Sequence, residues 1–316
     1  MKIIVFHQPF PMGNYKVCTA IAKKLSKMGH EVYSLQQLNG AQPDSEYVQQ
    51  IIDLNPDIVY SEMLDNETFK IVEKLKCKKI LTYVSKGILQ SWDDIYQYQG
   101  DWFTHIMTNS KQMETEFKSR NIPVVHFEWF FSVLEDEDKI FTSKYNHDCT
   151  FLGMGFQRMS SDVYQVEREA FFRELGGPWG DIDYKIYGNG WPQTSAHGGI
   201  LPGDDIGKLY SSSKTGIAII APGQRDFGMI NNRYSEMGSC GIPIITLQYP
   251  TVDWTGGEKY LNFVEPNRQS VVDLIKKIIY HLDEYKEKGN NMKKFIEEKS
   301  NVFFEKLQYV VEGRGL

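Results

Sequence analysis

Cysteine is scarce in this sequence of 316 residues, which contains only four. They are spread along the chain at Cys18, Cys77, Cys149 and Cys240, with no Cys-x-x-Cys pair and no histidine at ligand spacing. Structural zinc sites and disulfide frameworks both need clustered cysteines, so neither is expected here. The pattern favours a reducing compartment, and we expect a cytoplasmic protein.

Long apolar runs and an excess of basic charge are also missing. No stretch reaches the roughly 18 apolar residues that a membrane span needs, and the N-terminal MKIIVFHQPF has no small-residue cleavage site, so it predicts a first strand. The net charge of −6 argues against a nonspecific nucleic-acid binder. With 41% hydrophobic residues, the chain is expected to be globular and long enough for two domains.

Short β-rich runs alternate with helix-periodic segments in both halves. The predicted strands of the first half are KIIVFH (2–7), HEVYSL (30–35), DIVYSEML (57–64), KKILTYVS (78–85), THIMTNS (104–110) and PVVHFEWFF (123–131). Those of the second half are CTFLG (149–153), DYKIYG (183–188), GIAIIA (216–221), IPIITL (242–247) and NFVE (262–265), with a helix expected over 163–175. Between the halves, the acidic and poorly periodic segment 135–148 is interpreted as the linker.

Strands that alternate with helices predict parallel sheets, and two such halves predict two doubly wound, Rossmann-like α/β domains facing a central cleft. We expect an N-terminal domain over 1–142 and a C-terminal domain over 143–299. The final helix, 300–316, has one apolar face and is expected to pack back across the domains and join the first.

The second half carries a familiar order of segments: FLG (151–153), YKIYGNGW (184–191), HGGILPGDDIGKLYSSSKTGIAIIAPG (197–223) and NNRYSEMGSCGIPIITL (231–247). This order resembles the donor domain of GT-B glycosyltransferases, and most of all the spore-maturation (CgeB-like) branch. The resemblance covers roughly 150–285 and is only architectural over 1–140. It implies a metal-independent glycosyltransferase of the hexosyl or pentosyl type, with a nucleotide-diphosphate sugar as donor and no prosthetic group.

The run Asn232-Arg233-x-x-Glu236 has a physical meaning of its own. A helix that starts near residue 232 points its free N–H groups and its positive end toward the ligand edge of the sheet. Arg233 on the first turn could bind a diphosphate bidentately, and Glu236 one turn later could accept the ribose hydroxyls. The alternative is an ordinary surface ion pair between Arg233 and Glu236.

Further donor-side candidates come from the glycines and arginines of the same region. Gly188 and Asn189 follow a strand and would let the backbone approach the nucleotide, or they form a plain turn. Arg225 is a phosphate-binding candidate in the loop APGQRDFG. The resemblance implies the same role for Arg158, after the FLG strand, and implies that Gly13 belongs to a glycine loop approaching the donor from the first domain.

Two departures from the family pattern limit what can be inferred. The retaining enzymes often carry a second Glu eight residues before the first, but here that position is Gly228, so retention and inversion both stay open. Asp181 and Asp183 spell the Asp-x-Asp of metal-dependent transferases at the start of a predicted strand, which we interpret as chance. No metal is expected, because helix dipole and basic residues can stabilise the leaving diphosphate.

A catalytic base, if the reaction inverts, should lie on loops after strands of the first domain. By position the candidates are Asp93, Asp94 and Glu62. Each could also be a helix cap or a surface carboxylate. Three aromatic residues of segment 91–103, Trp92, Tyr96 and Trp102, are candidate platforms for the acceptor or part of the core. His30, His105 and His147 are interpreted as structural.

The sequence is compatible with several functions. A glycosyltransferase could act on a glycan, a lipid, a protein or a small molecule. A phage-type DNA glycosyltransferase would act on a hydroxymethylated pyrimidine and would need a basic groove, for which two lysine groups, 23–27 and 74–79, are sources. A nucleotide-sugar epimerase and a non-catalytic nucleotide-binding module are the alternatives of another class. We expect a UDP-sugar as donor; the base, sugar, acceptor and oligomeric state stay open.

Overall fold

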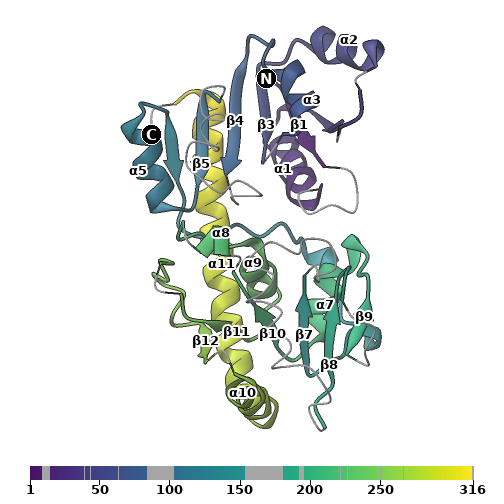
Figure 1. The fold of residues 1–316 in the computed structure, drawn as a ribbon, viewed down its shortest axis with the longest axis vertical. Coiled ribbons are helices and arrows are strands. Elements are labelled where there is room, and N and C mark those ends of the chain that lie inside the picture. Colours follow the sequence, from purple (N-terminus) through teal and green to yellow (C-terminus); the bar gives the residue numbers. More distant parts are fainter. Residues whose placement is uncertain are drawn as a thin grey trace. The chain divides into compact units, whose positions relative to one another are not determined.

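The computed structural model describes residues 1–8, 15–38, 40–42, 44–62, 64–83, 103–153, 181–191, 196–220, 222–225, 227–249, 251–265 and 267–314. The chain divides into two compact units, one formed by 1–128 with 302–316 and the other by 129–301. Each unit contains one six-stranded parallel sheet. The expected pair of doubly wound α/β domains is therefore confirmed (Figure 1).

The sheet of the first unit has the order β2-β1-β3-β4-β5-β6. Its strands are β1 (Lys2–His7), β2 (Glu31–Gln36), β3 (Ile58–Ser61), β4 (Lys78–Tyr83), β5 (His105–Thr108) and β6 (Val124–His126). Ile3, Ile4, Val5 and Phe6 are all fully buried, which is typical of a parallel strand covered on both faces.

Within the described ranges, the helices between these strands are α1 (Tyr15–Lys27), α2 (Ser45–Leu54), α3 (Asn66–Val72) and α5 (Lys111–Ser119). Polar side chains start them at defined residues. Asp44 accepts a hydrogen bond from the Glu46 amide at the start of α2, and Ser110 accepts one from the Met113 amide at the start of α5. Such caps satisfy amides that have no partner inside the helix.

The second unit has the sheet order β12-β11-β10-β7-β8-β9. Its strands are β7 (Cys149–Leu152), β8 (Tyr184–Tyr187), β9 (His197–Gly199), β10 (Gly216–Ala218), β11 (Ile244–Leu247) and β12 (Leu261–Val264). Its helices are α7 (Ile206–Ser212), α8 (Pro222–Arg225), α9 (Asn232–Ser239), α10 (Arg268–Tyr280) and most of α11 (Leu282–Glu312). Strand β9 is an addition that the sequence pattern did not predict, because His-Gly-Gly has no strand propensity.

Close backbone contacts hold the second unit together. A Cβ at Gly257 would lie 2.0 Å from Cζ2 of the buried Trp129, and a Cβ at Gly289 of α11 would lie 2.0 Å from the carbonyl oxygen of Gly241. The Trp129 ring also packs edge-on against Phe295, with centroids 5.2 Å apart. Glycine is therefore required where α11 and the Trp129 ring meet the loops of this unit.

Helix α11 starts in the second unit, and its last residues belong to the first. There Phe303 packs edge-on against Phe127 with ring centroids 5.0 Å apart, and Lys78 donates through Nζ to the Val310 carbonyl at 2.7 Å. The predicted strand over 123–131 is shorter than expected, because only Val124–His126 pair with β5 and the aromatic residues beyond them enter the cores. None of the helices in the described ranges has the length and hydropathy that crossing a bilayer requires.

Candidate functional site

The sheet of the second unit has a switch point between β7 and β10. The chain proceeds from β7 to β8 and β9 on one side, then crosses to β10 on the other. In open parallel sheets, ligands bind outside the carboxyl ends of the strands at such a point. Gly188 follows β8 at this edge, and the segment that follows β10 leads to the start of α9. Only β7 lies between β8 and β10, so these two strands are about 10 Å apart at the usual strand spacing.

A pocket of about 490 Å³ opens after β8 and along β9. Its lining consists of Gly188, Asn189, Gly190, Trp191, His197, Gly198, Gly199 and Ile200. The structure thus brings the predicted residues Gly188 and Asn189 together with the turn that starts at His197. Four of the eight lining residues are glycines, so much of the wall is backbone without side chains.

Two hydrogen bonds join the two sides of this pocket. The Gly188 amide donates to the Gly199 carbonyl at 2.9 Å, and His197 Nε2 lies 3.1 Å from the Gly188 carbonyl. A carbonyl can only accept, so this histidine carries its proton on Nε2. Gly188 and Gly199 have φ angles of 134° and 88°, a backbone region that favours glycine.

The first turn of α9 brings together the three candidates Asn232, Arg233 and Glu236. Asn231 caps the helix by accepting from the Arg233 amide at 3.2 Å. The Arg233 guanidinium donates to Glu236 Oε2 at 2.6 Å, and Asn232 Nδ2 donates to Oε1 at 3.1 Å. The Glu236 side chain is 4% exposed, whereas that of Arg233 is 28% exposed.

The ion pair that the sequence left as an alternative is therefore present, but it is not an ordinary surface pair. Glu236 is buried and bonded on both oxygens. Each carboxylate oxygen has a second lone pair, so Glu236 can still accept from hydroxyl groups. The partly exposed Arg233 is held by this carboxylate at the positive N-terminal end of α9, an arrangement suited to an anionic ligand.

Arg225 ends the short helix α8, in the loop before α9. Its guanidinium carbon lies 5.9 Å from the centre of the Tyr249 ring, within the range of a cation–π contact. Gly228 follows with a φ of 64°, and a Cβ there would lie 2.6 Å from the Thr251 carbonyl oxygen. The family's second Glu position is thus occupied by a residue that this packing restricts to glycine.

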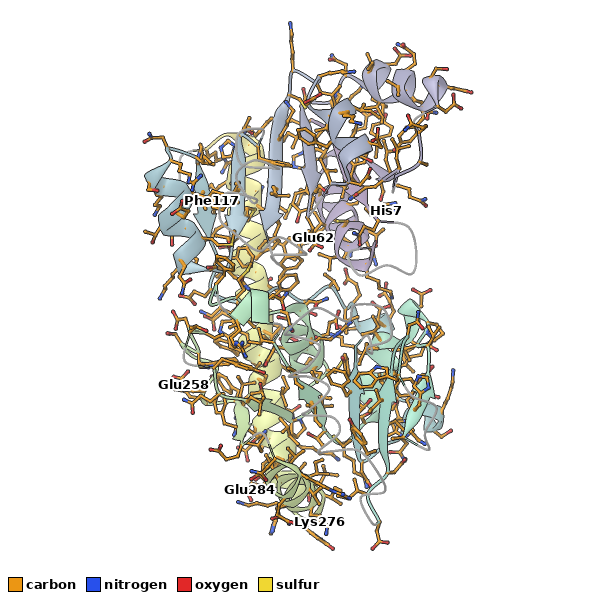
Figure 2. The ribbon with its side chains drawn as sticks, viewed as in Figure 1. His7, Glu62, Phe117, Glu258, Lys276 and Glu284 are labelled. Atoms are coloured by element: carbon orange, nitrogen blue, oxygen red, sulfur yellow. The ribbon has the colours of Figure 1, made fainter. Side chains whose placement is uncertain are left out.

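In the first unit, Glu62 follows β3 at the switch point between β1 and β3. The pairing of Phe6 with Ser61 places His7 at the same carboxyl edge (Figure 2). Glu62 is 7% exposed, and its Oε1 has no hydrogen-bond partner among the described residues. Burial raises the pKa of Glu62 to about 8, so at neutral pH the carboxyl group is mostly protonated.

Several other predicted residues cannot be placed, because they lie outside the described ranges: Gly13, Trp92, Asp93, Asp94, Tyr96, Trp102 and Arg158. Of the lysines considered for a basic groove, Lys78 donates to the Val310 carbonyl and Lys79 to the Leu75 carbonyl, both at 2.7 Å. Lys24 lies over the Phe304 ring. These three ammonium groups are thus engaged within the first unit.

A chain of hydrogen-bonded polar side chains in the second unit, which the sequence did not predict, joins the half-exposed carboxylate of Asp183 to the buried residues His147 and Tyr187. Asp183 Oδ2 forms a hydrogen bond with His147 Nδ1, and His147 Nε2 forms one with the hydroxyl group of Tyr187. No spacing signals it, because 36 and 40 residues separate His147 from its two partners. Among the described residues, no three His, Cys, Asp or Glu side chains lie together as a metal-binding group.

Residues 168–301 match the family model described as "Glycosyl transferase-like". A search of curated proteins found no match. Among solved structures, the chain is similar to a DNA-modifying β-glucosyltransferase studied with and without uridine diphosphoglucose, at 14% identity and a TM-score of 0.64 over 99% of this chain and 100% of that one.

Two further structures are similar over nearly their whole length. One is an α-glucosyltransferase in complex with UDP and a 13-mer DNA containing an HMU base, at 12% identity, a TM-score of 0.66, and coverage of 98% of this chain and 99% of that one. The other is an Anabaena protein, Alr3699/HepE, in complex with UDP-glucose, at 12% identity, a TM-score of 0.57 and the same coverage. At such identities the likeness concerns the fold, which is that of GT-B glycosyltransferases.

Proposed function

We propose that this chain is a metal-independent GT-B glycosyltransferase that moves a sugar from a nucleotide-diphosphate sugar, a UDP-sugar by preference, to a hydroxyl acceptor. One observation carries the proposal: the glycine-walled pocket and the capped start of α9 both fall inside the segment that matches the glycosyl transferase-like family. The second unit is thus assigned to the donor and the first to the acceptor. The CgeB-like branch remains our assignment within the wider family.

On the donor side, each residue has a role that its chemistry fits. The pocket around Gly188 and Asn189 binds the base, whose polar edge forms hydrogen bonds with backbone groups of the pocket. The α9 amides, Arg233 and Arg225 face the diphosphate, and Glu236 accepts the ribose hydroxyls. As the sugar leaves, negative charge grows on the diphosphate, and helix dipole and guanidinium groups stabilise it.

On the acceptor side, Glu62 is the base candidate that the structure describes. A buried carboxyl with a pKa near 8 is a stronger base than an ordinary glutamate once it is ionised, so it suits proton removal from a hydroxyl group. That role belongs to an inverting reaction, in which the acceptor oxygen attacks the anomeric carbon as the diphosphate departs. Asp93 and Asp94 remain proposals for the same task.

A calorimetric titration of UDP, GDP, ADP and UDP-glucose tests the donor site. We expect one diphosphate to bind, and Arg233→Lys to weaken it by roughly tenfold, because lysine keeps the charge and a partner for Glu236 but loses the bidentate fork. Arg120→Lys is the matched control: Arg120, at the C-terminal cap of α5 in the first unit, also pairs with a glutamate of the adjoining helix, Glu116, at 2.5 Å. Absence of binding by the wild type would refute the donor assignment.

DNA is a second candidate acceptor, favoured by the similarity to enzymes that modify or bind DNA. Of the lysines expected to form a basic groove, Lys78, Lys79 and Lys24 make contacts within the first unit. A gel-shift assay on duplex DNA with hydroxymethylated pyrimidines, at low salt, decides between the two classes. No shift, together with transfer to a glycan or small-molecule acceptor, would eliminate DNA. Isomerised donor without any acceptor would instead indicate an epimerase.

A further inference from the structure

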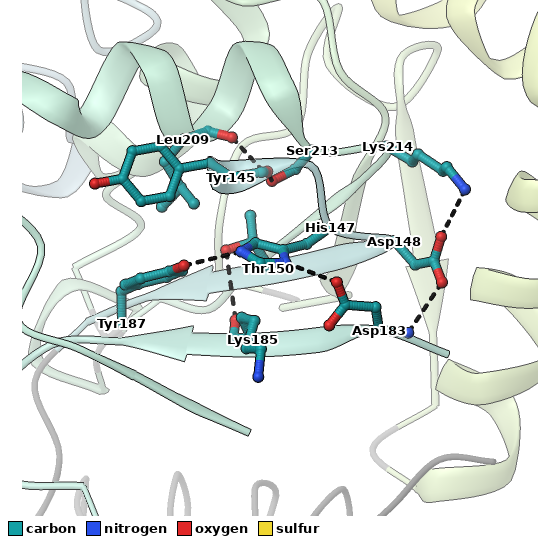
Figure 3. Close-up of polar contacts among 10 residues, drawn as sticks. All are labelled: Tyr145, His147, Asp148, Thr150, Asp183, Lys185, Tyr187, Leu209, Ser213 and Lys214. Carbon is teal, nitrogen blue, oxygen red and sulfur yellow. Dashed lines mark hydrogen bonds and ion pairs between the residues drawn. The ribbon is translucent and has the colours of Figure 1, made fainter. Parts of the chain in front are cut away.

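Asp183, His147 and Tyr187 of the second unit form a chain of three hydrogen-bonded side chains (Figure 3). His147 is 8% exposed, with Nδ1 2.8 Å from Asp183 Oδ2 and Nε2 2.8 Å from the Tyr187 hydroxyl. An ionised carboxylate only accepts, so Nδ1 carries a proton. In the neutral imidazole Nε2 then accepts, and the Tyr187 hydroxyl is the donor.

The members of this chain are held from other directions as well. Burial raises the pKa of Tyr187 to about 12, so its hydroxyl group keeps its proton at any ordinary pH. The Tyr145 ring packs edge-on against the Tyr187 ring with centroids 5.8 Å apart. Asp148 accepts from the Asp183 amide at 2.9 Å and from Lys214 Nζ at 2.7 Å. The position of the Tyr187 ring is therefore strongly determined.

The Tyr187 ring in turn supports the pocket. A Cβ on Gly198 would lie 2.4 Å from Cε1 and 2.5 Å from Cζ of Tyr187, so the β9 backbone rests directly on the ring beside its hydroxyl group. Gly198 lines the pocket, and its neighbour Gly199 accepts from the Gly188 amide across it. A wall of glycines has no side chains to anchor it, so its position depends on what lies behind it.

We propose that Asp183, His147 and Tyr187 are positioning residues that hold the β9 wall of the pocket in place for the nucleotide. They act through the backbone of Gly198 and do not touch the ligand. The identity of the ligand rests on the proposed function, whereas the positioning role rests on the contacts among these residues. Binding is favoured when groups that contact the ligand are fixed in advance.

Tyr187→Phe tests this with little change of shape, because it keeps the ring and removes only the hydroxyl group. We expect it to weaken binding of the preferred nucleotide by roughly three- to tenfold, as the loss of one buried hydrogen bond implies. At saturating donor, kcat should stay within about twofold, since the wall does not contact the reacting atoms. His147→Gln should weaken nucleotide binding to a similar extent. The variant with both substitutions should bind the nucleotide no more weakly than the weaker-binding of the two single variants, because both substitutions break the same hydrogen-bonded chain.

Tyr145→Phe is the matched control. It removes a hydroxyl group of the same cluster, one that donates to Asp205 Oδ2 at 2.6 Å and not to His147. We expect wild-type nucleotide affinity from it, measured far below the melting temperature of every variant. If Tyr187→Phe lowers the melting temperature but binds nucleotide as tightly as wild type, the three residues are structural only and the proposal is wrong.

Amide exchange in the ligand-free protein separates this proposal from the proposed function. Tyr187→Phe should speed exchange in peptides covering 197–200, and Tyr145→Phe should not. If wild type binds no nucleotide, the donor assignment fails, but exchange still decides whether the chain fixes the wall. Equal exchange in both variants would overturn the proposal even where nucleotide binding is observed.

Discussion

The buried carboxyl group of Glu62 makes the stability of the first unit depend on pH. Its pKa in the folded chain is about 8, against an ordinary value of 4.5, and the cause is burial without a charge partner. Between pH 4.5 and pH 8, Glu62 therefore holds its proton in the folded chain and has lost it in the unfolded chain. Stability is therefore greatest at low pH and is lost as the pH rises toward 8.

The size of the effect follows from the two pKa values. Between pH 5 and pH 7 the wild type should lose about 2.5 kcal/mol of folding free energy through Glu62, at about 1.4 kcal/mol per pH unit once the unfolded group is ionised. Glu62→Gln removes the titrating group and keeps its volume. The variant should therefore be less sensitive to pH and more stable than wild type at pH 7.

Urea unfolding at pH 5, 6 and 7 measures this difference, with amide exchange of β3 peptides to report the first unit separately. Glu73→Gln is the control, because Glu73 is an exposed glutamate of the same unit. It should follow the wild-type pH dependence. If Glu62→Gln also loses stability in parallel with wild type from pH 5 to pH 7, the Glu62 carboxyl is not buried in the protonated form, and the reasoning is refuted.

Three further outcomes are expected. If Glu62 is the base, kcat/KM should rise about tenfold per pH unit up to pH 8 and then level off; a flat profile from pH 6 to 9 would exclude that role. Gly257→Ala places a methyl group against Trp129 and should cost the second unit roughly 1–3 kcal/mol in urea unfolding, so a wild-type midpoint would contradict the packing. Gly228→Ala collides with the Thr251 carbonyl and should weaken nucleotide binding by displacing the loop before α9; an unchanged Kd would show that the loop adapts.

Much of the fold could be predicted from the sequence because it depends on local patterns. The short β-branched run from Ile3 to Phe6 is typical of a strand buried on both faces, and the alternation of such runs with helical periods predicts parallel sheets. The donor-side run Asn232-Arg233-x-x-Glu236 was also visible, since residues three and four apart share a helix face. Strand β9 escaped prediction because its glycines have no pattern of their own.

The candidate site was predictable only as far as its residues are neighbours in sequence. Gly188 and Asn189 could be singled out, but their meeting with His197 across one pocket depends on how β8 and β9 pair. The burial of Glu236 is likewise invisible in its motif. His147 was interpreted as a structural residue, and nothing in the sequence could connect it with Tyr187 or with the wall at Gly198.

The sequence by itself determined the class of the protein: two parallel-sheet domains, a glycine-rich edge and a basic helix start in the second. These features follow from propensities and periods that act over a few residues. The tertiary structure alone decided the ionisation of Glu62, the burial of Glu236 and the hydrogen-bonded chain behind Gly198. Each of these depends on desolvation or on contacts between distant segments, which arise only when the chain has folded.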